Sequence, residues 1–152
     1  MSANDQSGRS VSNAGDVNGD GFDDVIIGAH RDDPNGNAES GASFVVFGKE
    51  NGHVELSAVE INGAHNLGFV INGVGAGDYA GQSVSAAGDV NGDGFDDLLV
   101  GAPATTPIGE NSGSAYLVYG KGDSVPVELS ALRGDANLGL SLIHISEPTR
   151  LV

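Results

Sequence analysis

The chain has 152 residues and a formal net charge of −15, because 21 acidic residues stand against six lysines and arginines. This charge excludes a basic surface for nucleic acid, and the absence of cysteine excludes disulfides, zinc–thiolate sites and a cysteine nucleophile. The 25 glycines disfavour a mainly helical fold, since glycine destabilises a helix interior by about 1 kcal/mol relative to alanine. No apolar run is long enough to insert into a membrane. The composition predicts a turn-rich β protein with concentrated negative charge.

The chain contains two copies of one unit, which is the signature of a repeat architecture. Residues 7–29 and 80–102 are identical at seventeen of 23 positions with an offset of 73, and the nonapeptide DVNGDGFDD is identical throughout. Later segments also recur, because GASFVVFGK at 41–49 matches GSAYLVYGK at 113–121. We therefore divide the chain into a first repeat, residues 1–74, and a second repeat, residues 75–139.

Short apolar segments between Gly-, Asp- and Asn-rich turns predict strands in each copy. The first copy ends on a strand at about 68–74, and the second copy has strands at about 82–87, 98–100 and 115–119. The apolar run at 98–100 is typical of a strand buried on both faces. Four short strands per repeat favour an all-β fold of two consecutive four-stranded antiparallel β-propeller blades. A β-sandwich built from two repeats is the main alternative.

The repeated nonapeptide places an oxygen atom at every second residue, which suits Ca²⁺ with its about 6–8 oxygen ligands. Gly21 and Gly94 allow the sharp turn that such a loop needs. The alternation predicts that Val17 and Val90 point into the core, and that Asp23 and Asp96 face solvent. The predicted ligands, through side chains or through the carbonyls of the two phenylalanines, are Asp16, Asn18, Asp20, Phe22 and Asp24 in the first copy and Asp89, Asn91, Asp93, Phe95 and Asp97 in the second.

Three other interpretations of this loop are weaker. A solvated turn without metal would also be rich in Asp, Asn and Gly, but two identical copies favour a metal loop. Mg²⁺ prefers rigid octahedral geometry and retained water. An EF-hand needs an acidic residue at position 12 and flanking helices, whereas position 12 is Ile27 or Val100 and the flanks are expected to be strands.

These residues resemble FG-GAP repeats, the calcium-binding blades of integrin α-subunit N-terminal domains and of many bacterial surface proteins. The resemblance lies in the Asp-x-Asn-x-Asp-Gly-x-x-Asp loop, in Gly-Ala-Pro at 101–103, and in Phe47-Gly48 and Tyr119-Gly120, and it covers about residues 7–139. It implies a seven-bladed propeller with the loop between the first and second strands of a blade, and about one Ca²⁺ per repeat. The first copy departs from the pattern at His30, which replaces proline at a position that is not a ligand.

Two repeats cannot close a propeller, which typically has about 4–8 blades, so we expect the chain to be a fragment of a longer protein. The resemblance implies a secreted or cell-surface protein whose complete propeller serves adhesion or binds a protein or glycan partner. From the residues themselves we expect no enzyme activity, no nucleic-acid partner and no membrane insertion in this segment. The alternative is an accessory propeller domain of a secreted hydrolase, such as a phospholipase D-like enzyme. The first ten residues have no apolar segment of the signal-peptide kind.

Two segments outside the motif carry separate expectations. Residues 140–152 do not follow the repeat, and LSLIHISEPTR at 140–150 resembles a translated sequencing adapter, so we interpret them as a non-native tail. The second repeat would then lack its own fourth strand, although the alternation in this tail is compatible with a strand. Asp78 and Tyr79, between the copies, either face solvent in a turn or make a polar contact that holds adjacent blades together.

Overall fold

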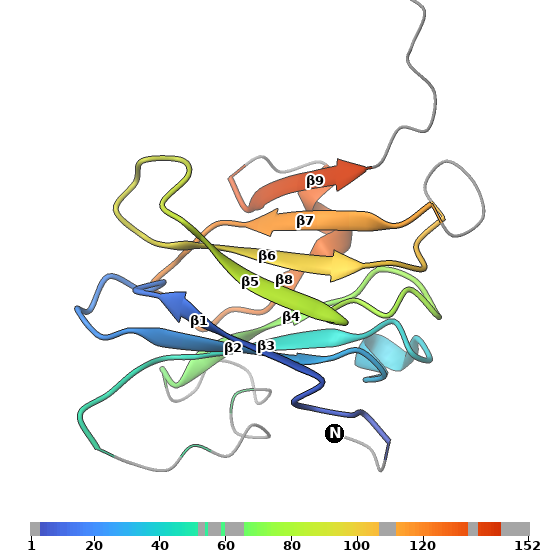
Figure 1. Ribbon diagram of the computed structural model, residues 1–152, viewed down its shortest axis with the longest axis horizontal. Coiled ribbons are helices and arrows are strands. Elements are labelled where there is room, and N and C mark those ends of the chain that lie inside the picture. The colour runs from blue at the N-terminus through green and yellow to red at the C-terminus, as the bar shows by residue number, and fades with distance from the viewer. Residues whose placement is uncertain are drawn as a thin grey trace, which may run out of the picture.

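The computed structural model describes residues 4–51, 66–106, 112–133 and 137–143, together with Val54 and Val59. The strands of the first sheet are β1 (Ser10–Gly15), β2 (Asp24–Ala29), β3 (Ala42–Val46) and β4 (Gly68–Asn72). The strands of the second are β5 (Ser83–Gly88), β6 (Asp97–Ala102), β7 (Ser114–Val118) and β9 (Gly139–Ile143). Two short 3₁₀ turns are η1 (Pro34–Gly36) and η2 (Leu129–Arg133). Successive strands of each sheet pair antiparallel (Figure 1), which confirms the two all-β blades. In the described part of the chain, no helix has the length and apolar character needed to cross a membrane.

One strand of the second repeat belongs to the first sheet. β8 (Val127–Glu128) pairs in parallel with β4, which gives the first sheet the order β1-β2-β3-β4-β8. Asn72 Nδ2 donates a hydrogen bond to Glu128 Oε1 at 2.6 Å, and Asn35 Nδ2 donates one to Glu128 Oε2 at 3.1 Å. The chain therefore leaves the second sheet after β7, adds a strand to the first, and returns through η2 to β9.

β9 takes the place of a fourth strand in the second sheet, as the alternation in its residues allowed. Because all of β9 except Gly139 lies within residues 140–152, the expectation that the second repeat, residues 75–139, lacks its own fourth strand stays a prediction. β9 pairs with β7 from Gly139 opposite Val118 to Ile143 opposite Ser114, the place that β4 has beside β3. The pairing uses main-chain groups, which an alternating sequence supplies whatever its origin. The interpretation of residues 140–152 as a non-native tail stays a prediction.

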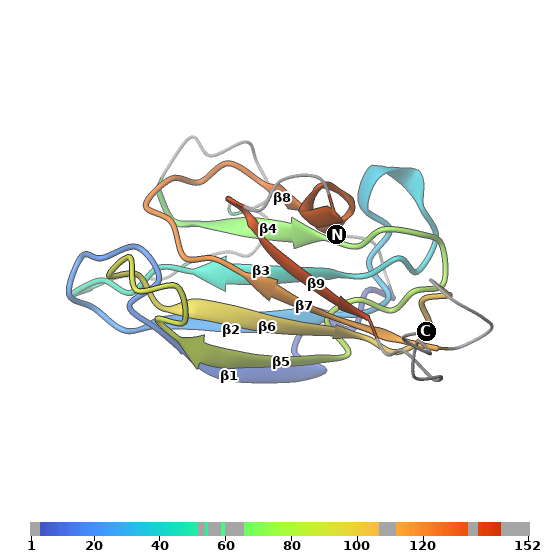
Figure 2. The ribbon, with the colours of Figure 1, turned by 90° about the horizontal axis from the view of Figure 1, so that it is seen from above.

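The main core lies between the two sheets, which face one another with β1 beside β5 (Figures 1 and 2). Its largest strand side chains are Ile26, Val45, Phe69 and Ile71 from the first sheet and Leu98, Val100, Tyr116 and Val118 from the second. Alternate residues of a strand point to opposite faces. Ile26 and Leu98 both point into this core, but the sequence counterpart of Leu98 is Val25, the neighbour of Ile26. The two repeats therefore present opposite faces of their sheets to this core. Each fully buried side chain of this size contributes about 1.5–3 kcal/mol.

Equivalent residues of the two repeats therefore differ in burial. Val25 is 44% exposed, whereas Leu98, its counterpart, is fully buried. Leu99 points away from the core and is only partly buried, so the expectation that 98–100 is buried on both faces is wrong. On the outer face of the first sheet, Phe44 and Val70 pack with Val59 in a smaller cluster.

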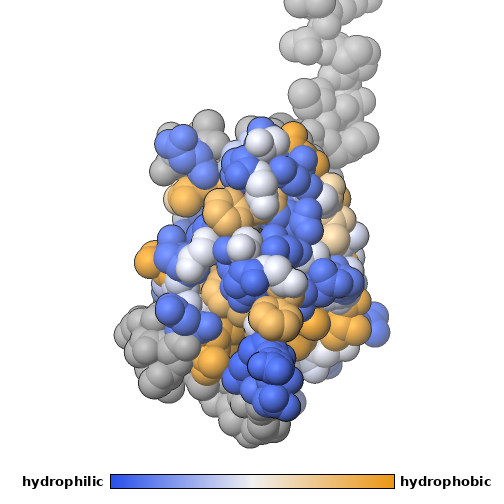
Figure 3. Space-filling model, turned by 90° about the vertical axis from the view of Figure 1, so that its left-hand side faces the viewer, coloured by the Kyte–Doolittle hydropathy of each residue, from blue (hydrophilic) through white to orange (hydrophobic). Residues whose placement is uncertain are grey.

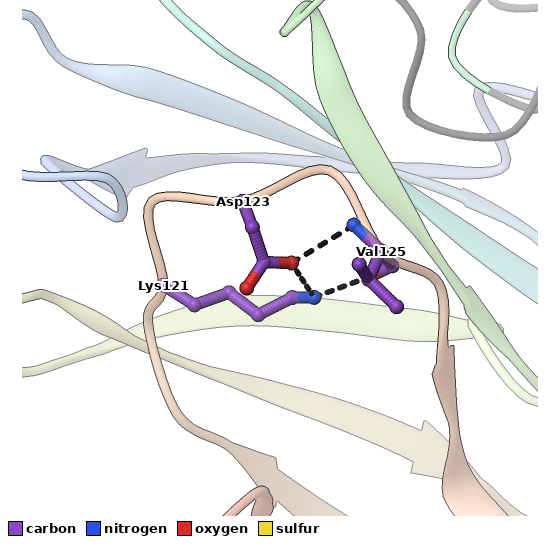
Figure 4. Close-up of polar contacts among 3 residues, drawn as sticks. All are labelled: Lys121, Asp123 and Val125. Carbon is purple, nitrogen blue, oxygen red and sulfur yellow. Dashed lines mark hydrogen bonds and ion pairs between the residues drawn. The ribbon is translucent and has the colours of Figure 1, made fainter.

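A lysine braces the turn that carries the chain from β7 to β8 (Figure 4). Lys121 Nζ lies 2.6 Å from Asp123 Oδ1 and also donates to the carbonyl of Val125, whose own N–H donates to Asp123 Oδ1 at 2.9 Å. Burial acts to raise the pKa of Asp123, but the Lys121 and Val125 hydrogen bonds and the lysine charge lower this pKa overall. Lys121 Nζ also lies 4.9 Å from the ring centroid of Phe69 in β4, so this side chain links the turn to the first sheet.

Tyr79 makes the polar contact between repeats that the sequence left open. Its hydroxyl donates a hydrogen bond to Glu39 Oε2 at 3.0 Å, and its main-chain N–H donates to the Glu39 carbonyl at 3.1 Å. The hydrogen bond to Glu39 raises the pKa of the Tyr79 hydroxyl. The Tyr79 ring also lies 5.9 Å from the His30 ring, centroid to centroid. The connection between the sheets is therefore anchored on the first repeat.

Candidate metal centre

The two Asp- and Asn-rich loops lie at the same end of the molecule. Loop one (residues 16–23) joins β1 to β2, and loop two (residues 89–96) joins β5 to β6, both at the left of Figure 1. Figure 3 looks onto this end, where hydrophilic side chains predominate among scattered hydrophobic ones. Each loop thus connects the first and second strands of its sheet, as the sequence resemblance implied.

Loop one is closed by its own main-chain N–H groups. The N–H of Asp20 donates to Asp16 Oδ1 and to Asn18 Oδ1, each at 3.0 Å. The N–H of Gly21 donates to Asp16 Oδ2 at 3.0 Å, and that of Phe22 donates to Asp20 Oδ1 at 2.9 Å. Short Asp and Asn side chains readily accept such local bonds, so the sequence itself favours this tight turn.

Loop two repeats the same pattern. The N–H of Asp93 donates to Asp89 Oδ1 at 3.0 Å and to Asn91 Oδ1 at 3.1 Å. The N–H of Gly94 donates to Asp89 Oδ2 at 2.9 Å, and that of Phe95 donates to Asp93 Oδ1 at 3.0 Å. Each distance is within 0.1 Å of its loop-one equivalent. The identical nonapeptides therefore adopt one local structure.

The aspartate at the ninth position ties each loop to the end of the third strand. Asp24 is 1% exposed, and its carboxylate accepts hydrogen bonds from the N–H groups of Val17 and Gly48, both at 2.8 Å. Asp97 makes the equivalent bonds at 2.8 and 2.9 Å. Burial raises the pKa of Asp24, the two N–H donors oppose the rise, and the negative charges of Asp20 and Asp16 add to it. Asp16 and Asp20 therefore lie close enough for their charges to act on the Asp24 carboxylate.

The donor set fits a hard cation, because carboxylate, amide and carbonyl oxygens are the ligands that Ca²⁺ prefers. The structure brings the five predicted ligand residues of each loop into one turn. Their side-chain oxygens point to main-chain N–H groups, and within the described residues no group of three or more His, Cys, Asp or Glu side chains is arranged to hold a metal ion. The loops thus have the donor types that Ca²⁺ prefers, in a conformation that their own main-chain N–H groups close.

The second residue of each loop shows how the neighbouring repeat changes its surroundings. Val17 is fully buried in the core between the sheets, as predicted, but Val90 is 53% exposed. Loop two and the turn after β7 cover loop one, so that a Cβ on Gly120 would lie 2.8 Å from the Val17 carbonyl. No described element covers Val90 in the same way. The prediction that Val90 points into the core is wrong for this reason.

The eighth residue behaves differently in the two loops as well. Asp23 is exposed as expected, and its carboxylate meets Asn13 Nδ2 at 3.5 Å. Asp96 does not simply face solvent, because its Oδ2 accepts a hydrogen bond from the Asp16 N–H at 2.9 Å. Its own N–H donates to the Asp16 carbonyl at 3.0 Å. Asp96 therefore joins loop two to the first predicted ligand of loop one.

Sequence reasoning missed this junction and the residues that allow it. A Cβ on Gly15 would lie 2.1 Å from Asp96 Oδ2, and a Cβ on Gly19 would lie 2.6 Å from the Phe95 ring. Both glycines have left-handed φ values, +74° and +75°. The glycines were visible in the sequence, but the nonapeptide carries no signal that tells an inner junction from an open face.

Two stacked antiparallel sheets, each with the same Asp- and Asn-rich loop between its first and second strands, define a repeat protein of the propeller-blade type. The family model for the FG-GAP repeat matches residues 7–46 and 80–118. The chain belongs to the FG-GAP repeat family.

Similar proteins are integrin α chains. The chain is 30% identical to integrin alpha-PS5 of Drosophila melanogaster over 117 residues, or 71% of the chain and 10% of that protein. It is 38% identical to integrin alpha pat-2 of Caenorhabditis elegans over 97 residues, or 62% of the chain and 7% of that protein. It is 31% identical to integrin alpha-7 of Mus musculus over 127 residues, or 80% of the chain and 9% of that protein. The chain thus spans a tenth or less of the length of these relatives.

Proposed function

We propose that the chain is a calcium-binding part of a secreted or cell-surface β-propeller protein, and that the assembled propeller binds a protein or glycan partner without catalysing a reaction. The observation that carries the calcium proposal is the recurrence of one hydrogen-bonded loop structure at both FG-GAP motifs. Similarity to integrin α chains supports the surface location and the binding role.

Calcium would offset the negative charge that is concentrated in the two loops. Each loop with its ninth residue contains four aspartates, so the two account for eight of the 21 acidic residues. Burial is the main cause that raises the pKa of Asp24, and the negative charges of Asp20 and Asp16 add to the rise, so negative charge is concentrated around this carboxylate. A bound Ca²⁺ supplies positive charge to these carboxylates. Extracellular calcium modules bind with Kd of about 10⁻⁴–10⁻³ M, which suits a permanently occupied structural ion.

The open faces of the two sheets support a larger propeller. Val25 and Val90 are 44% and 53% exposed, whereas their counterparts at the junction, Leu98 and Val17, are fully buried. A further repeat stacked on each open face would bury these side chains in the same manner. Closed propellers typically contain about 4–8 such blades.

Isothermal titration of the 152-residue chain with CaCl₂ tests the calcium proposal. We expect saturable binding of about two ions at millimolar affinity or tighter. The double variant Asp20→Ala, Asp93→Ala, which removes one predicted ligand from each loop, should lose this signal. Glu50→Gln, which removes an exposed carboxylate outside both loops, should bind as the unchanged chain does. Unchanged binding by the double variant would refute the assignment of the loops.

A further inference from the structure

Asp96 reaches from loop two into loop one. Its carboxylate accepts from the Asp16 N–H at 2.9 Å, and its N–H donates to the Asp16 carbonyl at 3.0 Å. We propose that Asp96 is a positioning residue that holds Asp16 in place for calcium and thereby couples the two loops. This inference rests on the proposed calcium binding.

The bonds of Asp16 show why its position depends on the neighbouring repeat. Its carboxylate already receives the N–H groups of Asp20 and Gly21 inside loop one. Asp96 occupies both the N–H and the carbonyl of the Asp16 main chain, so Asp16 is held at its backbone from outside the loop and at its side chain from inside. A residue held at both ends pays little additional ordering entropy when an ion binds.

A second contact also reaches from loop two to loop one. The Phe95 ring packs over Gly19, where an added Cβ would lie 2.6 Å from a ring carbon. Phe22, the equivalent residue in loop one, is 47% exposed. Residues 95 and 96 of loop two therefore press on loop one at two points, while Phe22 and Asp23 make no such junction within the described chain.

The direction of the coupling follows from this asymmetry. Calcium in loop two would order both residues, because Phe95 is itself a predicted ligand and Asp96 lies between the predicted ligands Phe95 and Asp97. Ordered Asp96 then favours the Asp16 conformation that loop one uses, so filling loop two strengthens binding in loop one. By thermodynamic reciprocity, filling loop one strengthens binding in loop two by the same factor.

The test isolates loop one by placing Asp93→Ala, which removes a ligand of loop two, in every variant. Titration calorimetry then measures calcium binding to loop one with Asp96 intact and with Asp96→Ala. We expect Asp96→Ala to weaken this binding about tenfold, the equivalent of one lost charge-assisted hydrogen bond. Asp96→Asn keeps an oxygen acceptor for the Asp16 N–H and should retain most of the affinity.

Asp23→Ala is the matched control, because it removes the same charge from loop one itself without touching the junction. It should weaken binding less than Asp96→Ala does. Hydrogen exchange of the Asp16 amide in calcium-free buffer gives a second readout, and Asp96→Ala should make this exchange at least several-fold faster.

All three variants remove one negative charge. If Asp23→Ala or Asp96→Asn weakens calcium binding as much as Asp96→Ala does, the lost charge alone explains the weaker binding, and the positioning role is overturned. Unchanged affinity in Asp96→Ala would overturn it as well. Absence of calcium binding in the unmodified chain would instead overturn the proposed function, and the inference with it. The conservative Asp96→Asn variant also keeps the test valid if Asp96→Ala does not fold.

Discussion

Replacement of Gly15 by alanine should destabilise the protein far more than replacement of Gly88, its counterpart in the second repeat. The two glycines have almost the same backbone conformation, with φ of +74° and +72°. A Cβ on Gly15 would lie 2.1 Å from Asp96 Oδ2, whereas a Cβ on Gly88 would meet no atom within 4 Å. The pair thus separates backbone strain from the contact between repeats.

The magnitudes follow from these two observations. Alanine in the left-handed region costs about 1–2 kcal/mol at either position, and the entropy that alanine removes from the unfolded chain offsets about 0.4–1 kcal/mol of this in both variants. In Gly15→Ala, the Asp96 carboxylate must also leave the Asp16 N–H. Loss of a hydrogen bond to a charged group costs about 1.5–3 kcal/mol, so Gly15→Ala should be less stable than Gly88→Ala by that amount.

Urea unfolding in calcium-free buffer measures this difference directly, since the free energy of unfolding falls linearly with denaturant. The two variants and the unchanged chain should share one m-value if only the native state is affected. A difference between Gly15→Ala and Gly88→Ala smaller than about 0.5 kcal/mol, within the range of surface substitutions, would refute the reasoning and show that the Asp96 junction does not stabilise the fold.

Leu98→Ala should lower the free energy of unfolding by about 2–5 kcal/mol, because Leu98 is fully buried between the sheets. Its counterpart Val25 is 44% exposed, so Val25→Ala should lower the free energy of unfolding by less than about 1 kcal/mol. Urea unfolding of both variants measures the difference, and equal losses would contradict this packing. Burial, aided by two nearby arginines, lowers the pKa of His30, so the stability that its neutral form contributes is present above the unfolded-state pKa of 6.5 and is lost as the pH falls through the folded-state pKa. The unchanged chain should therefore lose more stability than His30→Gln between about pH 7 and pH 5, and parallel pH profiles would count against this explanation. Lys121→Met keeps an apolar stem over β4 but removes the hydrogen bonds to Asp123 and to the Val125 carbonyl. Because the Asp123 side chain is 61% exposed, thermal unfolding should show a loss of about 1 kcal/mol or less; a loss above about 3 kcal/mol would mean that the lysine charge matters far more than the exposure of Asp123 suggests.

The loops show which part of a site can be predicted from a short sequence. The identical nonapeptides predict similar local structure, and the hydrogen bonds that the two loops share agree to within 0.1 Å. They cannot predict that Val17 is buried and Val90 exposed, or that Asp96 bonds to another loop while Asp23 does not. These differences depend on which sheet face lies against a neighbouring repeat, and the nonapeptide has no information about its neighbours.

The fold was predictable to a similar depth. Short apolar segments between turn residues predict the strands because these are local signals, and four short strands per repeat favour their antiparallel order in a blade. β8 has only Val127 and Glu128, too short a segment to show any period, and it pairs with a sheet that begins more than a hundred residues earlier in the chain. β9 pairs where the alternation of its residues was compatible with a strand, because main-chain pairing does not depend on the origin of a sequence.

β8 also has a consequence for how such a protein can be divided or rearranged. The first sequence repeat ends near residue 74, but the last strand of the first sheet, β8, consists of residues 127–128. A cut at the sequence boundary would leave β4 as a bare sheet edge, open to pairing with other chains, and would leave β8 without a sheet. The smallest unit that recombination could exchange intact is therefore shifted along the chain from the unit that was duplicated.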